Sequence, residues 1–130
     1  MTPARSRPTT TRAALRELVV RSPRPDALEQ WYRDALGLEG SGGVLRAGSM
    51  AVRIRPAREL ATLVREPMRL MPNFVVDDAV GVERRLIGMG ATWVRELEAT
   101  PWARIATVLD PDGGYVQVLE LAGATAGVTP

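Results

Sequence analysis

Three residue types are missing from this chain: it has no cysteine, no histidine and no lysine, so that all 17 basic residues are arginine. Without cysteine there can be no disulfide, no thiolate metal site and no cysteine nucleophile. Without histidine the chain lacks imidazole metal ligands and the commonest general acid–base side chain. Without lysine it has neither the cation of a phosphate-binding P-loop nor the amine of a Schiff base. Carboxylates are the plausible bases that remain.

Long apolar runs and concentrated charge are also missing. No run approaches the roughly 20 residues of a membrane-spanning helix, and no signal-peptide pattern opens the chain, so we expect a cytoplasmic protein with no membrane contact. The formal net charge is only +2, and the arginines are spread along the chain rather than gathered in a basic stripe. We therefore expect no nucleic-acid partner.

What the chain does contain is the composition of one globular domain. Its 130 residues are 45% apolar and 25% charged, which is the balance of a domain with a hydrophobic core. Residues 1–13 and 123–130 hold few apolar side chains, and we expect loose or disordered tails there. The ordered part is predicted to span 14–122 as a single domain.

Within this domain the same order of elements occurs twice. Module one spans 15–56 and module two 69–121, and Glu17 and Met71 occupy equivalent places about 54 residues apart. In module one the patterns predict a strand at 15–21, a helix at 27–36 that ends at Gly37, a turn cluster at 40–43 and a hairpin of 44–47 with 50–55. In module two they predict a strand at 70–76, a helix from 77–78 to 88–90, strands at 91–97, 104–109 and 115–121, and a tight turn at 110–114. We interpret both halves as strand–helix–strand–strand–strand units that share one core.

Three segments resemble motifs of the vicinal oxygen chelate superfamily, which includes glyoxalase I, bleomycin-resistance proteins and extradiol dioxygenases. Residues 31–38 (WYRDALGL) resemble the end of its first helix. Residues 76–78 (VDD), followed by a helix that ends at 88–91 (GMGA), are similar to the opening of its second module. Residues 110–114 (DPDGG) resemble the turn before its last strand, with Gly114 where the family commonly has Asn. Together the motifs cover 15–121.

The resemblance implies an α+β fold in which two βαβββ modules form a cup-shaped, curled mixed sheet with the helices outside. The family's metalloenzymes bind a divalent metal in the cup through four strand positions. Carried over to this chain, those positions fall on Glu17, Arg53, Met71 and Gln117. Methionine and arginine do not suit a hard cation, and two remaining ligands are too few, so we expect neither metal nor other cofactor. A Glu17–Arg53 ion pair in the vacated place is a hypothesis; its alternative is that both side chains reach solvent at the rim.

The register that places Glu17 in the cup also predicts the cup's other side chains and leaves apolar residues facing the helices. Trp31 lies on the apolar stripe of its helix and is expected in the core, whereas Trp93 could face either layer and Trp102 lies in a loop. The two carboxylates of the 110–114 turn are explained by the turn itself. The predicted ligand-binding residues are Arg21, Arg53, Arg55, Met71, Asn73, Trp93, Trp102, Tyr115 and Gln117.

Three functions stay open on this basis. The first is a metal-independent, small-molecule binding protein of the glyoxalase/bleomycin-resistance type, which binds or sequesters a neutral or anionic, aromatic natural product or metabolite, as in antibiotic resistance. The second is a metal-free isomerase, cyclase or hydrolase with Glu17 as general base and Tyr115 as a weaker catalytic candidate. The third is a non-catalytic subunit whose cup is vestigial. By resemblance to family members of this length we also expect a homodimer.

Overall fold

The computed structural model describes residues 13–57 and 70–123, and it confirms the twofold repeat. The first module runs β1 (Glu17–Ser22), α1 (Pro25–Leu36), β2 (Glu39–Ser41), β3 (Val44–Ala47) and β4 (Met50–Pro56). The second runs β5 (Asn73–Val75), α2 (Ala79–Gly88), β6 (Trp93–Ala99), β7 (Ala103–Leu109) and β8 (Tyr115–Leu121). The predicted tails fall outside the described residues, except at their inner ends. No helix in the described part is long and apolar enough to cross a membrane.

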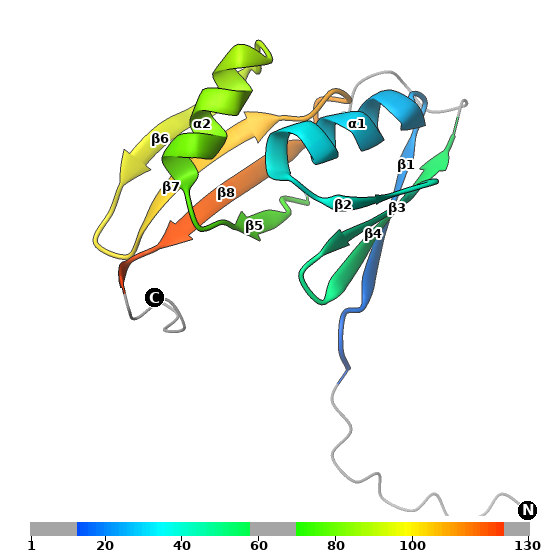
Figure 1. Ribbon diagram of the computed structural model, residues 1–130, viewed down its shortest axis with the longest axis horizontal. Helices are drawn as coiled ribbons and strands as arrows, with labels where there is room; N and C mark the ends of the chain where they lie inside the picture. The colour runs from blue at the N-terminus through cyan, green and yellow to red at the C-terminus, as the bar shows by residue number, and fades with distance from the viewer. Residues whose placement is uncertain (1–12, 58–69, 124–130) are drawn as a thin grey trace, which may run out of the picture.

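Each module forms its own four-stranded mixed sheet with the same topology. The strand orders are β1-β4-β3-β2 and β5-β8-β7-β6, with the first pair parallel and the others antiparallel. Val19 pairs with Arg53 in the first sheet, and Asn73 pairs with Gln117 in the second. The first members of these pairs are 54 residues apart, as the sequence repeat predicts. Figure 1 shows the two sheets splayed apart, with both helices on the same side of them.

One hydrophobic core joins the two modules. The aromatic ring of Tyr32 on α1 lies edge-on to Trp31, with centroids 5.1 Å apart, and 5.9 Å from the ring of Phe74 in the second module. Trp31 is buried, as predicted. Helix-facing side chains of both sheets belong to the same cluster, so the two modules share one core. The buried cluster comprises Leu28, Trp31, Tyr32, Ala35, Leu45, Val52, Ile54, Val82, Leu86, Val108, Val116 and Val118.

The ends of the helices follow from local chemistry. Helix α1 begins at Pro25, two residues before the predicted start, because proline is well suited to the first position of a helix. It ends where the following Gly37 adopts a left-handed conformation, with φ of 69°. Helix α2 is capped by Asp78, whose Oδ1 accepts a hydrogen bond of 3.0 Å from the N–H of Gly81. The predicted helix end at Gly37 and the predicted start of the second helix at 77–78 are therefore confirmed.

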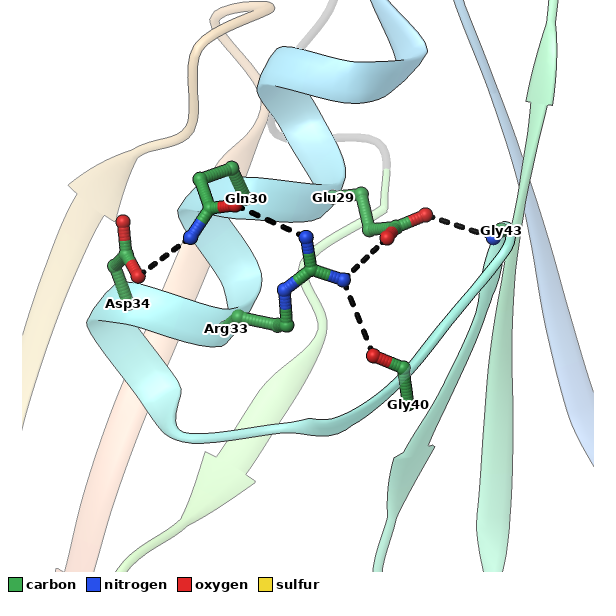
Figure 2. A network of polar contacts seen from close by, with 6 residues as sticks. All are labelled: Glu29, Gln30, Arg33, Asp34, Gly40 and Gly43. Atoms are coloured by element: carbon green, nitrogen blue, oxygen red, sulfur yellow. Dashed lines mark hydrogen bonds and ion pairs between the residues drawn. The ribbon is translucent and has the colours of Figure 1, made fainter.

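A polar network on α1 holds the β2–β3 hairpin in place (Figure 2). Glu29 Oε1 accepts a hydrogen bond of 2.7 Å from the N–H of Gly43, and Glu29 Oε2 forms an ion pair with Arg33. Arg33 also donates to the carbonyl of Gly40 at 3.1 Å. The sequence predicts only a turn at 40–43, whereas the structure forms the short strand β2 and then a tight turn at 42–43. Strand pairing and these contacts from α1 override the weak strand propensity of glycine.

The turn at 110–114 of module two is bound to α1 of module one. Asp110 Oδ1 accepts hydrogen bonds of 2.9 Å from two backbone N–H groups of the turn, so the turn explains this carboxylate, as expected. Arg24 lies 3.6 Å from Asp112 Oδ1. Burial, the charges of Asp110 and Asp112, and hydrogen bonding to Asp110 raise the pKa of Tyr32 well above its ordinary value of 10.0. Two of the motifs that carry the family resemblance therefore contact each other across the modules.

Candidate functional site

The face of each sheet that points away from the helices, called here the helix-free face, carries the candidate site. Val52 and Ile54 on β4, and Val116 and Val118 on β8, are buried on the opposite side. Arg53 alternates with the first pair and remains partly exposed. Successive strand residues point to opposite faces, so this burial pattern confirms the predicted register of both strands.

A carboxylate–guanidinium pair lies on the helix-free face of the first sheet. Arg53 Nε lies 3.2 Å from Glu17 Oε1 and 3.4 Å from Oε2, while Arg53 Nη2 lies 3.3 Å from Oε2. The side chains of Glu17 and Arg53 are 41% and 33% exposed. The hypothesis of this ion pair is thus confirmed, and the pair is partly solvated rather than deeply buried. Solvent screening therefore limits its contribution to stability.

A hollow of about 430 Å³ adjoins this pair. Its base is Ala51, which is Cα partner to Glu17 on β1 and to Arg46 on β3. Directly paired residues project from the same face of a sheet, so the short alanine leaves space between two long side chains. Arg46 Nη2 donates a hydrogen bond of 3.2 Å to the carbonyl of Ser49 in the β3–β4 turn. The hollow is lined by Arg16, Glu17, Val44, Arg46, Ser49, Ala51 and Arg53.

Most of this lining was not anticipated from sequence. Glu17 and Arg53 were predicted as site residues, whereas Arg16, Arg46 and Ser49 were not. A signal for Arg46 existed, because a two-residue turn at 48–49 places Arg46 opposite Ala51. Arg16 lies just before β1, where strand alternation gives no guide, although its carbonyl accepts a hydrogen bond of 3.0 Å from the N–H of Ala51.

The predicted residues Arg21 and Arg55 lie at the other end of the same face. They are Cα partners in the parallel β1–β4 pair, and each is four residues beyond Glu17 or Ala51 along its strand. This corresponds to about 13 Å. Neither lines the hollow. The structure therefore places three predicted arginines on one face but brings only Arg53 to the Glu17 carboxylate.

The helix-free face of the second sheet holds three of the other predicted residues, namely Asn73, Tyr115 and Gln117. Asn73 pairs with Gln117, and Gln117 pairs with Thr107. Gln117 Nε2 donates a hydrogen bond of 3.3 Å to Thr107 Oγ1. Met71 lies just before β5, because the strand at 70–76 is shorter than predicted, and Tyr115 begins β8. This face is neutral in these positions, in contrast to the charged face of the first sheet.

The position of Trp93 is a correction. Trp93 pairs with Val108, which faces the helices, and its side chain packs against the core. It therefore does not share the helix-free face of the second sheet with Tyr115 and Gln117. A large indole on the helix-facing side of the sheet buries apolar surface against the core.

Trp102 is 58% exposed in the turn between β6 and β7. Ala122, after the end of β8, donates a hydrogen bond of 2.9 Å to its carbonyl, whereas Tyr115 begins β8. Six residues of strand separate the two ends, which corresponds to about 20 Å. Trp102 and Tyr115 of one chain therefore do not contact the same small ligand together.

The donor set does not suit the metal that this fold holds in other proteins. Glu17 is the one carboxylate among the four positions implied by the resemblance, and both of its oxygens face Arg53. Gln117 uses its amide nitrogen on Thr107. Among the described residues, no group of three or more Asp and Glu side chains is arranged to hold a metal ion. A hard cation at this place would lie beside a guanidinium, which repels it.

Comparison with known proteins agrees with the fold. The profile of the family described as "Glyoxalase-like domain" matches residues 17–119. A search of curated proteins finds no significant match. An integron cassette protein from V. cholerae has a similar structure with a TM-score of 0.68 and 16% identity, covering 88% of this chain and 99% of that one.

Two further solved structures are similar. TioX from Micromonospora sp. ML1 has a TM-score of 0.64 and 20% identity, covering 85% of this chain and all of that one (100%). A glyoxalase/bleomycin resistance protein/dioxygenase family enzyme from Burkholderia phytofirmans PsJN has a TM-score of 0.68 and 17% identity, covering 85% and 100% of the two chains. At these identities the structures establish the fold alone. Because the family profile covers most of the chain, this protein belongs to the glyoxalase-like domain family, within the vicinal oxygen chelate superfamily.

Proposed function

We propose that this protein binds a small organic molecule without a metal ion. The ligand is neutral or anionic and aromatic, and binding or sequestering it, as resistance proteins do with antibiotics, is the function. The single observation that carries this proposal is the Glu17–Arg53 pair beside an arginine-lined hollow. The family resemblance implies that both residues stand at metal-ligand positions of the superfamily's metalloenzymes. The hollow also argues against a vestigial site, because a vestigial site needs no space for a ligand.

The sign of the charge supports the choice of ligand. The hollow is lined by three arginines and one carboxylate, so its formal charge is positive. A cationic ligand would meet net repulsion there, whereas an anionic ligand gains charge-assisted hydrogen bonds. The neutral side chains of Met71, Tyr115 and Gln117 on the second sheet suit the uncharged part of an aromatic molecule.

Thermal unfolding in the presence of candidate ligands tests the proposal. The panel consists of aromatic polyketides, acidic aromatic metabolites and aromatic cations, each with EDTA and with added Mn²⁺, Ni²⁺ or Zn²⁺. We expect at least one acidic or neutral aromatic to raise Tm equally in EDTA and in metal, because a ligand that binds only the folded state stabilises it. Stabilisation by cations alone, or only in the presence of metal, contradicts the proposal.

A metal-free enzyme is the second candidate, and the position of Glu17 favours it. Glu17 is the one carboxylate that lines the hollow, so it is the available general base in an isomerase, cyclase or hydrolase. The Glu17→Gln variant separates the two functions. Loss of turnover with retained ligand binding supports an enzyme, whereas the absence of turnover in the native protein with every ligand that binds supports a binding protein. Tyr115 lies on the other sheet and is the weaker catalytic candidate.

We also propose a homodimer as the working form, in the cytoplasm. Val19 on β1 and Val75 on β5 project from the helix-free faces and are largely exposed in a single chain. A second copy that covers these faces would bury both side chains. Light scattering coupled to gel filtration is expected to give twice the chain mass. A Val75→Glu variant is expected to shift the mass toward the monomer, whereas an unchanged mass in this variant removes Val75 from the interface.

A further inference from the structure

We infer that the acidic group of the ligand, a carboxylate, binds in the hollow between Arg16 and Arg46, above Ala51. This inference rests on the proposed small-molecule function and gives it a ligand class and an orientation. It uses residues outside the Glu17–Arg53 pair, whose positions the family resemblance equates with metal ligands.

The first support is the distribution of partners among the charges. Glu17 uses both carboxylate oxygens on Arg53. Arg46 contacts the carbonyl of Ser49, which carries no formal charge. In the described part of the chain, neither Arg16 nor Arg46 forms an ion pair with a carboxylate. Arg16 and Arg46 therefore line one hollow, and neither has a carboxylate within ion-pair distance among the described residues, although Glu17 lines the same hollow and Glu39 is the Cα partner of Arg46 on β2. Their forked donors are not committed to a carboxylate and suit a planar one from a ligand.

The second support is the shape of the hollow. Glu17, Ala51 and Arg46 occupy one row across three neighbouring strands. Strand spacing places the outer two Cα atoms about 10 Å apart. Ala51 between them is 6% exposed and lines the hollow together with both. The space above a methyl group between two long side chains admits a small charged group, whereas a larger residue at position 51 would fill it.

The third support comes from the internal repeat. The pairing of Arg53 with Val19 and of Gln117 with Asn73 makes Ala51 equivalent to Tyr115. In the second sheet, Tyr115 pairs with Leu109 where Ala51 pairs with Arg46. The same row therefore carries a short side chain and a cation in one module, and two bulky neutral side chains in the other. The space above Ala51 and the positive charge of Arg46 beside it therefore occur in the first sheet and have no equivalent in the second.

A pair of probes that differ only in charge tests this subsite. Isothermal titration calorimetry would compare 2-naphthoate with 2-naphthamide on the full chain at low salt. We expect the acid to bind about tenfold more tightly than the amide, which is the effect of one charge-assisted contact. Equal affinities of acid and amide overturn the subsite and leave the proposed function standing. If neither probe binds and the whole panel of acidic and neutral aromatics fails as well, both are overturned.

Single arginine variants test where the carboxylate of 2-naphthoate binds. Arg16→Gln and Arg46→Gln are each expected to weaken 2-naphthoate about tenfold and to leave 2-naphthamide unchanged. Arg104→Gln is the matched control, since it removes the same charge from the helix-facing side of β7, next to Glu120. A loss of affinity as large in this control as in Arg46→Gln overturns the inference, because the effect is then one of net charge.

Two further variants act on the space and on the neighbouring carboxylate. Ala51→Leu is expected to abolish binding of 2-naphthoate without changing any charge. Glu17→Gln is expected to tighten it several-fold, because the change releases Arg53 and removes the one negative charge in the hollow. Weaker binding of the acid to Glu17→Gln overturns the inference. Thermal unfolding of each variant establishes that it is folded, and the tighter binding expected of Glu17→Gln cannot arise from misfolding.

Discussion

At the scale of single residues, Asp110 is the described carboxyl group whose raised pKa couples pH to stability. Burial raises the pKa of its carboxyl group above the ordinary value of 3.8, against the opposing effect of backbone N–H donors in its turn. A carboxyl group with a raised pKa favours the folded state most when it is protonated. Its contribution is therefore fully present below pH 3.8 and is lost as the pH rises through the raised value.

The Asp110→Asn variant tests this sign. Asparagine keeps an oxygen that accepts the backbone hydrogen bonds and removes the titration. Urea unfolding between pH 4 and pH 7 is expected to show a flatter pH dependence for Asp110→Asn than for the native protein, with the relative stability of the variant rising with pH. Parallel curves for the two proteins would show that another group is responsible.

The contribution of the Glu17–Arg53 ion pair to folding stability can also be measured. Its geometry allows two donors to face one carboxylate, yet both side chains are a third or more exposed. A double-mutant cycle with Glu17→Gln and Arg53→Gln is expected to give a coupling free energy of no more than about 1 kcal/mol. This is measured by urea unfolding at low and high salt, and the coupling is expected to shrink with salt. Zero coupling at low salt would remove the pair from the account of the fold.

At the scale of elements, the contact of α1 with the β2–β3 hairpin decides the shape of the first sheet. Glu29 is largely buried and links Gly43 of the hairpin to Arg33. Glu29→Ala leaves the N–H of Gly43 and the guanidinium without this acceptor, so we expect a loss of about 2 kcal/mol in unfolding free energy. Gln30→Ala is the matched control, because the exposed Gln30 contacts only side chains of its own helix, and we expect less than about 0.5 kcal/mol.

The contacts of Glu29 and Arg33 with the β2–β3 hairpin also affect the candidate site. The carbonyl of Gly43 accepts a hydrogen bond of 2.8 Å from the N–H of Ile54, and Val44 begins β3 next to it. If the β2–β3 hairpin lost its contacts with α1, the protein would be less stable and Arg46 on β3 would no longer be held in place. Comparison of amide hydrogen exchange in Glu29→Ala and Gln30→Ala checks this, since faster exchange in β3 is expected for the first variant alone.

At the scale of the whole molecule, the shared core predicts a single unfolding transition. Leu28 in module one and Leu86 in module two are both fully or almost fully buried in the same cluster. Truncating either to alanine is expected to cost about 3 kcal/mol and to destabilise both modules together. The fluorescence of Trp31 and of Trp93, isolated by Trp→Phe substitution of the other tryptophans, reports each module. Separate midpoints for these two probes would show independent modules.

The two sheets also differ as wholes, although their topology is the same. The first presents Glu17, Arg46 and Arg53 on its helix-free face, and the second presents Asn73, Tyr115 and Gln117 there. The repeat therefore preserves the backbone while the side chains on the equivalent positions differ in charge. A ligand with an acidic end and a neutral aromatic part matches this division.

The local elements were largely predictable from the sequence because their signals are local. The stop at Gly37, the cap at Asp78, the alternation along β4 and β8, and the 54-residue repeat all depend on neighbours along the chain. Two elements were misjudged for the opposite reason. Strand β2 exists through pairing with β3 and contact with α1, and β5 is short because its pairing with β8 covers only three residues.

The sequence by itself determined the absence of cysteine, histidine and lysine and the alternation of the strands, because these follow from residue identity and strand period. The Glu17–Arg53 pair was predicted only with the help of the family resemblance. The tertiary structure alone decided which side chains share a space. It brought Arg16, Arg46 and Ser49 around Ala51, packed Trp93 against the core and separated Tyr115 from Trp102. These outcomes depend on cross-strand pairing and on packing between layers, which join residues far apart along the chain and leave no local pattern to identify them.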